Sequence, residues 1–576
     1  MKKSFTIEGT NAVGDYLVIP SNITKALIHG TSTEQPIQIF DKDGNPERIC
    51  KLSHEHNLIS GLESWFHSNH VDKHSLISIE INRKKKDEPP SVCLTCERIA
   101  EDDTHMMNLG IYKETKGIYA QLEDHKFSIN PTALLTHAFV CGMTGSGKTY
   151  CMKVIVEEAL KAGIPVVAID LKGDISSLGI QPLSLLPDVL SKFLQYDEDS
   201  SDIARAHAIQ TKQATIKALR NFSINESEAL DFSNKYDFKL LTPGAAHGIP
   251  VSLANQLNPP PNAADLMKTD RDLFDEMCTS VTESFFSRLF PSSGRDSYSN
   301  ERAFLHTLMR YCWKNEINLS GVKGLELLRG YLEAPPFDEI AGESVEVLLR
   351  GGRAARLKDR FTTLMSAPED KWFQGRALTI ELLINNRNGK TPLTVISVPP
   401  SAQFNDRAYI VSQVCFTIVS WMLGAGETSF PRLLLFIDEI GAQGGETSLF
   451  PSNPRNPPSK RFLSQIVRQG RSFGVCALLG TQNPTDIDYK ALSNCGLWMV
   501  SHLKNRSDRY NILSTMYVHD MRRPSVEGWL AREEKGRFVI KSPDKPDVFY
   551  VQMRHLQTLH QTLDRNRLIQ LKELWP

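Results

Sequence analysis

The segment "THAFVCGMTGSGKTY", which ends at Tyr150, constrains the fold of this chain more than any other part of it. Residues 142–149 fit the pattern GxxxxGK[ST], with an apolar run before the pattern and a run of helical spacing after it. In a strand–loop–helix unit of this kind the glycines let backbone N–H groups converge on phosphates, and the positive end of the helix faces the same charge. We therefore expect an α/β fold that binds a nucleoside triphosphate.

The loop residues have separate tasks in such a site. Lys148 would reach the β and γ phosphates, and Thr149 would be a ligand of Mg²⁺. The site thus predicts ATP and Mg²⁺ as cofactors. The other residues expected along the nucleotide are Gly142, Met143, Thr144, Gly145, Ser146, Gly147 and Tyr150.

An acidic pair much later in the chain fits the same site. In "RLLLFIDEIGAQG" an apolar strand would carry Asp438 and Glu439 to the edge of a sheet. Asp438 would hold Mg²⁺ through water, and Glu439 would polarise an attacking water molecule. An acidic pair after a strand is common, but together with the phosphate loop it favours hydrolysis over group transfer.

Two further polar clusters flank the next apolar strand. "VCALLGTQNP" would place Gln482 at the carboxyl edge, where doubly wound sheets bind ligands. There the amide could sense the γ-phosphate or orient water, and a polar turn before Pro484 is the alternative interpretation. Upstream, "QIVRQGRSFG" holds Arg468 and Arg471. A guanidinium from a neighbouring subunit would neutralise charge on a transferring phosphoryl group, whereas an arginine at a helix C-terminus is also explained by the helix dipole.

Apolar strands alternate with helical patterns along most of the chain, which indicates a mostly parallel sheet with helices on both faces. The expected core strands are "HAFVCG", "IPVVAID", "PLTVISV", "RLLLFID", "GVCALLGTQ" and "GLWMVSH". The long helical stretch between the second and third of these is interpreted as an insertion. The predicted fold class is an α/β P-loop NTPase core. The predicted domains are a β-rich, barrel-like domain at 1–104, the first part of the core at 105–175, the helical insertion at 176–390, the second part of the core at 391–535, and strands and a helix at 536–576 that could brace neighbouring subunits.

Bulk properties exclude some classes of protein. Lys and Arg number 66 and Asp and Glu 67, so the net charge of −1 gives no general affinity for polyanions. The most apolar run, "YIVSQVCFTIVSWMLGAG", is interrupted by polar residues, and the N-terminus lacks the apolar region of a secretory signal. We expect a cytoplasmic protein that does not contact a membrane.

The ten cysteines are scattered over 576 residues and do not form a disulfide framework. One pair, Cys93 and Cys96, has the spacing of metal ligands, and Cys50, His54 and His56 could complete a zinc site. A lone CxxC pair in a β-rich segment is more often structural, so zinc binding by these residues stays open.

A contact with nucleic acid would need a local basic surface. The candidates are Arg353, Arg356 and Arg360 on one face of a predicted helix, Lys172 after the second core strand, and Lys504 and Arg506 in a loop. Such residues would contact phosphates and not bases. The alternative is that they are solvated surface charges.

In their order along the chain, several blocks resemble the HerA/FtsK group of hexameric P-loop motors, closest to HerA-like DNA-translocating ATPases. The blocks are "THAFVCGMTGSGKT", "VVAIDLKGDISSLG", "PLTVISV", "LLLFIDEI", "VRQGRSFGVCALLGTQNPTDID" and "LSNCGLWMVSHL", within residues 105–560. The resemblance implies a RecA-like core, a homo-hexameric ring with ATP at subunit interfaces, and double-stranded DNA in the channel. It identifies Arg471 as the arginine donated in trans, with Arg468 as the second candidate.

The resemblance also implies partners. Bacterial HerA-like ATPases work with separate nucleases in DNA-end processing, and with nucleases or NAD-consuming effectors in phage defence. Residues 1–100 show no motif of the small β-barrel that typically begins the family, and the chain shows no nuclease motif. We expect a separate effector that docks on the N-terminal domain. The alternatives to a DNA translocase are a nucleotide-gated scaffold that assembles an effector without moving DNA, and a conjugation or secretion ATPase, which the lack of a transmembrane anchor weakens.

Overall fold

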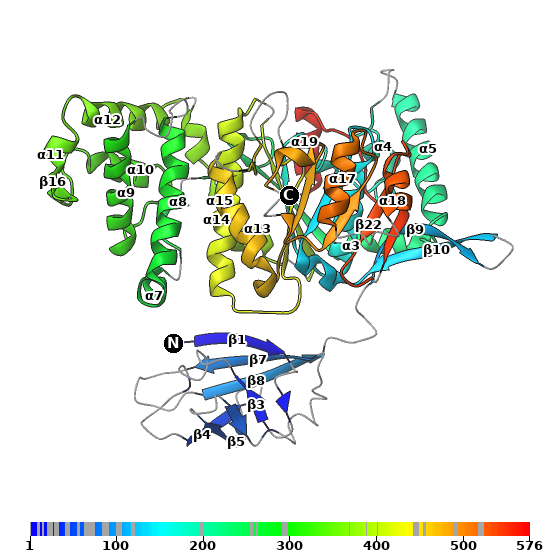
Figure 1. Cartoon of the computed structure of the whole chain (residues 1–576), viewed down its shortest axis with the longest axis horizontal. Helices are drawn as coiled ribbons and strands as arrows, with labels where there is room; N and C mark the ends of the chain where they lie inside the picture. The colour runs from blue at the N-terminus through cyan, green and yellow to red at the C-terminus, as the bar shows by residue number, and fades with distance from the viewer. Residues whose placement is uncertain are drawn as a thin grey trace. The chain divides into compact units, whose positions relative to one another are not determined.

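The computed structural model divides the chain into two compact units, Met1–His105 and Met106–Pro576, each described by itself (Figure 1). The residues that the structure describes are 2–8, 12–13, 16–19, 27, 34–40, 46–53, 58–60, 62, 75–82, 91–98, 106–116, 121–195, 201–253, 257–260, 263–290, 298–367, 369–386, 389–399, 401–441, 448–452, 457–488, 492–516, 523–545 and 547–575.

The N-terminal unit is a single eight-stranded sheet in the order β1-β7-β8-β4-β5-β6-β3-β2. Its strands are β1 (Lys2–Glu8), β2 (Ala12–Val13), β3 (Tyr16–Val18), β4 (Glu34–Phe40), β5 (Pro46–Ser53), β6 (Leu58–Ser60), β7 (Ser75–Asn82) and β8 (Ser91–Arg98). Alternate residues such as Ile37 and Ile39, or Ile79 and Ile81, are buried together, as expected for strands with one face on a core. The predicted β-rich N-terminal part is confirmed.

The second unit is built on a thirteen-stranded sheet in the order β10-β9-β23-β22-β21-β11-β20-β19-β12-β18-β13-β14-β17. Neighbouring strands are parallel from β21 to β17, and β22, β23, β9 and β10 extend one edge in antiparallel fashion. The strands are β9 (Met107–Lys116), β10 (Gln121–Ile129), β11 (Ala138–Cys141), β12 (Val166–Asp170), β13 (Tyr236–Pro243), β14 (Ile249–Ser252), β17 (Arg376–Ala377), β18 (Thr391–Ser397), β19 (Leu433–Ile437), β20 (Val475–Thr481), β21 (Leu497–Val500), β22 (Arg537–Lys541) and β23 (Val548–Met553). The predicted α/β class with a mostly parallel sheet is confirmed.

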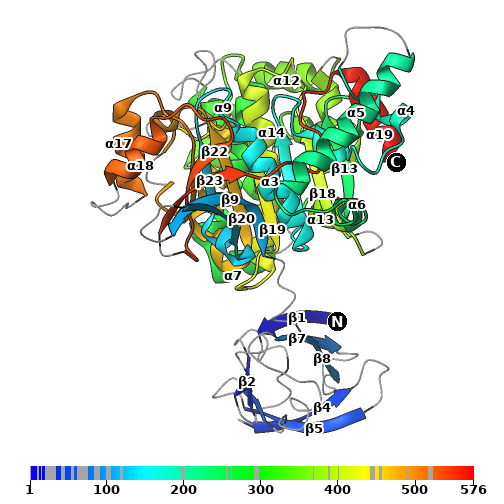
Figure 2. The same ribbon diagram turned by 90° about the vertical axis from the view of Figure 1, so that its right-hand side faces the viewer.

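Both faces of this sheet are buried, which explains why its strands read as continuous apolar runs. In β11, Phe139 and Cys141 belong to one hydrophobic core, and Ala138 and Val140 belong to the other. Helices α3 (Lys148–Lys161) and α19 (Arg565–Leu574) contribute to the second core, and α3 lies across the strands (Figure 2). Helices α8 (Arg271–Leu289), α14 (Phe404–Gly424) and α15 (Pro458–Gln469) contribute to the first.

The segment predicted as a helical insertion also contributes β13, β14 and β17 to the large sheet, which the sequence analysis did not foresee. In β13 the buried Lys239 interrupts the apolar run and donates to the carbonyl of Asn385 at 3.1 Å, so the strand lacks the usual apolar pattern. The remaining helices are α4 (Pro187–Leu190), α5 (Ser201–Arg220), α6 (Glu226–Lys235), α7 (Ala263–Thr269), α9 (Ser299–Lys314), α10 (Gly321–Gly330), α11 (Val345–Leu348), α12 (Arg353–Leu364), α13 (Ile380–Ile384), α17 (Arg506–Thr515) and α18 (Arg523–Leu530). Figure 1 shows α8 to α12 grouped at one end of this unit. Within the described part of the chain, no helix is long and apolar enough to cross a membrane.

Candidate functional site

The predicted phosphate loop connects β11 to α3 at the carboxyl edge of the parallel strands. Gly145 and Gly147 have φ of +84° and +94°, in the left-handed region that side chains disfavour. The loop is anchored from outside, because Met143 donates to the carbonyl of His502 at 3.2 Å and Gly536 donates to that of Ser146 at 2.9 Å. The first turn of α3 therefore presents its amide groups next to a loop of fixed shape.

The two predicted carboxylates meet this loop directly after β19. Lys148 forms an ion pair with Oδ1 of Asp438, and its Nζ lies 2.9 Å from Oε1 of Glu439. The Thr149 hydroxyl donates to Oδ2 of Asp438 at 2.5 Å. The structure thus brings together four predicted residues that are almost three hundred positions apart, because β11 and β19 both border β20.

Gln482, just beyond the end of β20, bridges the loop and the acidic pair. Its Nε2 donates to Oε1 of Glu439 at 2.5 Å, and its Oε1 accepts from the hydroxyl of Thr144 at 2.5 Å. An amide in this place contacts both the phosphate loop and the carboxylate predicted to act on water. The polar-turn alternative is present as well, since the Thr481 hydroxyl accepts from the backbone N–H of Asn483.

The ionisation of Lys148 and Glu439 is set by the opposite charges close to them. Burial alone would lower the pKa of the Lys148 amine, but the carboxylates of Asp438 and Glu439 outweigh burial and raise it. Burial would likewise raise the pKa of Glu439, but Lys148, Gln482 and Lys172 outweigh burial and lower it. Glu439 is therefore an ionised carboxylate at neutral pH.

The residues at this edge fit a magnesium-bound nucleotide. The Ser146 hydroxyl oxygen is buried in the loop and has no hydrogen-bond partner within the described residues. Thr149 and Asp438 supply adjacent oxygen atoms, the donor type that Mg²⁺ prefers. Across the described ranges there is no group of three His, Cys, Asp or Glu side chains that could hold a metal alone. Thr149 and Asp438 would hold the ion together with phosphate oxygens.

Arg468 and Arg471 lie at the other end of the parallel strands. Arg468 is in the last turn of α15, and Arg471 is in a 3₁₀ turn, Gly470–Phe473, that leads into the amino end of β20. Gln482 follows the carboxyl end of the same strand, so about 20 Å of strand separates it from Arg471. Both arginines are exposed. They do not face the phosphate loop of their own chain.

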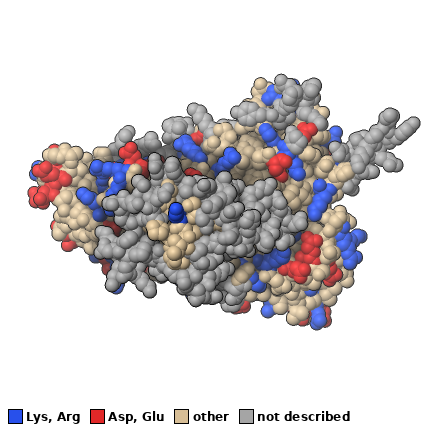
Figure 3. All heavy atoms as spheres, turned by 90° about the horizontal axis from the view of Figure 1, so that it is seen from below, with Lys and Arg blue, Asp and Glu red and all other residues tan. Residues whose placement is uncertain are grey.

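The predicted basic residues have varied surroundings. Arg356 pairs with the buried Glu301 at 2.6 Å, and Arg353 donates to backbone carbonyl groups near the start of α12. Arg360 lies with Arg288 and Lys371 around a cavity of about 400 Å³. Lys504 is exposed and Arg506 is exposed beside Glu527, at 3.7 Å. Figure 3 shows Lys and Arg interspersed with Asp and Glu on the described part of the face in view.

Lys172, predicted as a DNA contact, lies instead at the candidate nucleotide site. Its Nζ is 3.0 Å from Oε1 of Glu439. The two residues meet because the strands before them, β12 and β19, are adjacent and parallel, and the sequence did not show that adjacency. In the N-terminal unit, Cys50 and Cys93 lie on β5 and β8, whereas His54, His56 and the side chain of Cys96 fall outside the described residues.

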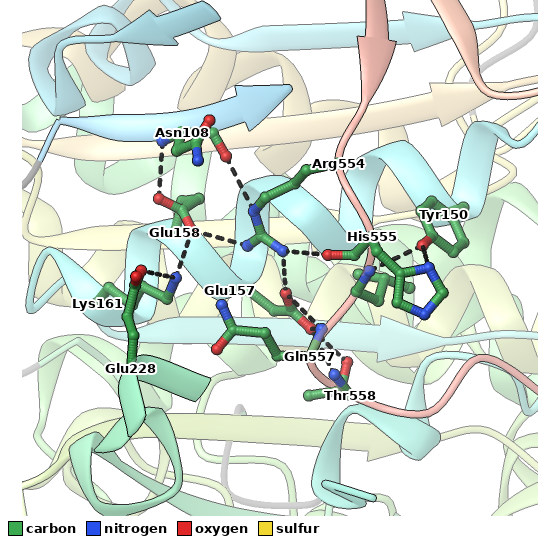
Figure 4. A network of polar contacts seen from close by, with 11 residues as sticks. Asn108, Tyr150, Glu157, Glu158, Lys161, Glu228, Arg554, His555, Gln557 and Thr558 are labelled. Atoms are coloured by element: carbon green, nitrogen blue, oxygen red, sulfur yellow. Dashed lines mark hydrogen bonds and ion pairs between the residues drawn. The ribbon is translucent and has the colours of Figure 1, made fainter. Parts of the chain in front are cut away.

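Sequence reasoning missed a buried ionic network between α3 and the C-terminal segment (Figure 4). Arg554, fully buried, pairs with Glu157 and Glu158 of α3 at 2.7 Å each and donates to the carbonyl of Asn108 at 2.9 Å. The Tyr150 hydroxyl accepts from the backbone N–H of Leu556 at 2.8 Å. The one available signal was the adjacent glutamates inside the otherwise apolar run "KVIVEEAL".

Comparisons with known proteins find similarity in the region that contains the phosphate loop and α3. Residues 119–184 match the family model described as "Helicase HerA, central domain". The same region is similar to "Probable helicase MJ1565" of Methanocaldococcus jannaschii, with 34% identity over 67 residues, which are 12% of this chain and 13% of that protein. Over this segment the predicted resemblance to HerA-like ATPases is confirmed.

Several solved structures resemble this chain at low sequence identity. VirB4 of Thermoanaerobacter pseudethanolicus has 11% identity and a TM-score of 0.43, with 79% of this chain and 97% of that chain covered. The bacterial conjugative coupling protein TrwB, in a complex with sulphate, has 15% identity and a TM-score of 0.43, with 76% and 89% covered. TrwB bound to ADP and Mg²⁺ has 15% identity and a TM-score of 0.42, with 75% and 89% covered.

Proposed function

We propose that this chain is an ATP-hydrolysing motor that moves along double-stranded DNA as a homo-hexameric ring. The observation that carries the proposal is the meeting of Lys148, Thr149, Asp438 and Glu439 at one edge of the sheet. This set combines a cation for phosphate, oxygen ligands for Mg²⁺ and a carboxylate for water. The match of residues 119–184 to a helicase central domain supports DNA as the substrate of the motion.

In this proposal each residue has one task. Lys148 leaves the carboxylates and binds the β and γ phosphates, while the loop amides and the first turn of α3 surround them. Thr149 and Asp438 would hold Mg²⁺, and this ion would supply positive charge that neutralises the phosphates. Glu439 accepts a hydrogen bond from the water that attacks the γ-phosphorus, and Gln482 orients that water. ADP and phosphate are the products.

The positions of Arg468 and Arg471 support sites shared between subunits. Both lie near the amino end of β20, about 20 Å of strand away from Gln482. Neither can reach the phosphates of its own chain without unfolding the strand. In a ring, however, the amino edge of one sheet can face the carboxyl edge of the next. Arg471, with Arg468 as the second candidate, would then neutralise charge on a neighbour's nucleotide.

The finer parts of the proposal concern DNA and an effector. Arg360, Lys504 and Arg506 are exposed cations that could follow a duplex backbone, six times around a ring. A separate nuclease or NAD-consuming enzyme would dock on the N-terminal unit, in DNA-end processing or in defence against phage. The resemblance to HerA-like ATPases is the support for this partner.

Steady-state ATP hydrolysis with and without linear duplex DNA tests the proposal. We expect DNA to stimulate turnover severalfold at low salt, and Glu439→Gln to reduce turnover by about 100-fold or more. Lys217→Met, on an exposed face of α5, is the matched control and should behave as the unmodified chain. A chain that hydrolyses no ATP would contradict the proposal. A turnover rate that is the same with and without DNA would favour the nucleotide-gated scaffold instead.

A further inference from the structure

Lys172 lies in a loop whose backbone is fixed by several hydrogen bonds. It follows β12, and the carboxylate of Asp170, which is fully buried, accepts hydrogen bonds from the backbone N–H groups of Gly173 at 2.6 Å and Ser176 at 2.8 Å. The Ser176 hydroxyl also donates to it, at 2.6 Å. A carboxylate with several short hydrogen bonds to one loop fixes the path of that loop.

The C-terminal segment supports the same loop from outside. The backbone N–H of Leu563 donates to the carbonyl of Gly173 at 2.9 Å. Gly173 has φ of +85°, and a Cβ at this position would lie 3.4 Å from the methyl group of Thr562. The positive φ disfavours a side chain at this position, and the Thr562 methyl group lies at ordinary contact distance. The Lys172 side chain therefore starts from a backbone that is fixed on two sides.

From this position Lys172 reaches Glu439. Strands β12 and β19 are parallel neighbours, with Ile169 opposite Ile437, so the residues beyond their carboxyl ends lie at the same level. Lys172 Nζ lies 3.0 Å from Oε1 of Glu439. The carboxylate is 3% exposed, whereas the lysine side chain is 38% exposed. The lysine thus approaches the buried carboxylate from the solvent side.

The same oxygen of Glu439 is contacted by Lys148 at 2.9 Å and by Gln482 at 2.5 Å. In the proposed function, Lys148 leaves Glu439 when it binds the phosphates. When it moves, Lys172 and Gln482 are the described groups that still hold the carboxylate. Glu439 has φ of +58°, a conformation that a non-glycine residue keeps only where its surroundings enforce it.

We propose that Lys172 is a positioning residue that keeps the carboxylate of Glu439 aligned for the attacking water while Lys148 binds the nucleotide. This inference rests on the proposed ATP hydrolysis and goes beyond it by assigning a role to a second lysine. It replaces the expectation that Lys172 contacts DNA. Lys172 acts through Glu439 and does not itself touch the reacting atoms.

The test compares basal ATP hydrolysis, without DNA, by the unmodified chain, Lys172→Met, Lys172→Arg, Glu439→Gln and the double variant Lys172→Met/Glu439→Gln. We expect Lys172→Met to lower kcat about 10-fold or more, the usual weight of a hydrogen bond between charged groups, with KM changed less than about threefold. Lys172→Arg should restore most of kcat. The double variant should be no slower than Glu439→Gln alone, because residues that act as a unit are not additive.

Several results would overturn the inference. An unchanged or increased kcat in Lys172→Met would do so, as would a rise in KM alone, which would indicate phosphate binding. If Lys172→Met lost duplex DNA binding but kept normal basal turnover, Lys172 would be a DNA contact and not a positioning residue. Lys217→Met is the control, and melting temperatures verify that each variant is folded. An unmodified chain without hydrolysis would refute the proposed function as well, whereas normal turnover lost only in Glu439→Gln would refute this inference alone.

Discussion

At the scale of single residues, Glu439 has a strained backbone conformation and Gly480 leaves little room for a side chain. Glu439 has φ of +58° and is 4% exposed. A left-handed conformation of a non-glycine residue costs about 1–3 kcal/mol, and such residues cluster at functional sites. Next to it, a Cβ on Gly480 would lie 2.5 Å from Oδ1 of Asp438 and 2.6 Å from Sδ of Met152. A methyl group at this position would therefore displace the side chains of Asp438 and Met152.

We predict that Gly480→Ala lowers ATP turnover at least about 10-fold, because Asp438 must shift away from the new methyl group and catalytic geometry tolerates little displacement. Overpacking should also cost about 1–3 kcal/mol of unfolding free energy. Turnover and thermal melting are the measurements. Gly424→Ala is the control, since no atom lies within 4 Å of its Cβ position. Normal turnover in Gly480→Ala would contradict the packing described here.

His137, just before β11, should make the fold sensitive to acid. It is 1% exposed, its Nδ1 accepts from the backbone N–H of Ala477 at 3.1 Å, and burial, aided by the charge of Arg471, lowers its pKa to about 4. Above pH 6.5 the imidazole is neutral in both the folded and the unfolded chain. Between pH 6.5 and 4 only the unfolded chain binds the proton, so stability falls as the pH falls, by up to about 3 kcal/mol.

We predict that His137→Asn flattens this dependence, because asparagine keeps a hydrogen-bond acceptor, tolerates a positive φ and does not titrate. Chemical denaturation at pH 7.5, 6 and 5 would measure the slope of unfolding free energy against pH. His207→Asn on α5 serves as the comparison and should keep the slope of the unmodified chain. An equal slope in His137→Asn would show that other groups cause the acid sensitivity.

At the scale of elements, α3 connects the phosphate loop to the C-terminal segment. The loop lies at its amino end, and Glu157 and Glu158 near its other end bind Arg554 (Figure 4). Glu157 also accepts from the backbone N–H groups of Gln557 and Thr558 at 2.9 and 2.8 Å. Helix α3 therefore contacts both the phosphate loop and the C-terminal segment that supports the Lys172 loop.

Arg554→Met should destabilise the core by about 3–5 kcal/mol, because it leaves two buried carboxylates without their cation. The triple variant Arg554→Met/Glu157→Gln/Glu158→Gln should recover part of this loss, since no buried charge then remains there. Urea denaturation would compare the midpoints. Arg532→Met is the control, because Arg532 is largely exposed and lies 3.9 Å from Glu534. A single variant as stable as its control would contradict the cost assigned to the buried charges.

At the scale of the whole molecule, the large sheet separates the two halves of the proposed catalytic machinery. Asp438, Glu439 and Gln482 follow the carboxyl ends of their strands, and Arg471 precedes the amino end of β20. In the proposed function, a single chain therefore carries one half of a site at each edge of its sheet. Closure of a ring would complete every site with two subunits, which is how symmetric assemblies use heterologous contacts.

We predict that mixing Arg471→Ala and Glu439→Gln chains restores turnover that neither has alone. In a randomly mixed ring roughly a quarter of the interfaces would pair an intact glutamate with an intact arginine. ATP hydrolysis after subunit exchange is the measurement. Each variant alone, at the same total concentration, is the control. A mixture as inactive as its components would indicate that each chain completes its own site.

The sequence alone determined the local parts of this protein. The spacing of the glycines, Lys148 and Thr149 identifies a phosphate loop because the pattern is contiguous, and the run before Asp438 identifies a buried strand because a covered parallel sheet needs apolar residues on both faces. Both predictions depend only on neighbours in the chain. Gln482 was found for the same reason, as a polar residue directly after an apolar strand.

Only the tertiary structure decided what these parts touch. The order of strands in the sheet brings Lys172 to Glu439, so a lysine expected at DNA lies at the candidate nucleotide site. The tertiary structure also buries Arg554 against Glu157 and Glu158 of α3. Strand β13 was not predicted, because Lys239 interrupts its apolar pattern. In the structure this lysine donates a hydrogen bond to the carbonyl of Asn385, which is far away in the sequence. Contacts between residues hundreds of positions apart depend on strand order and register, which neither local spacing nor composition contains.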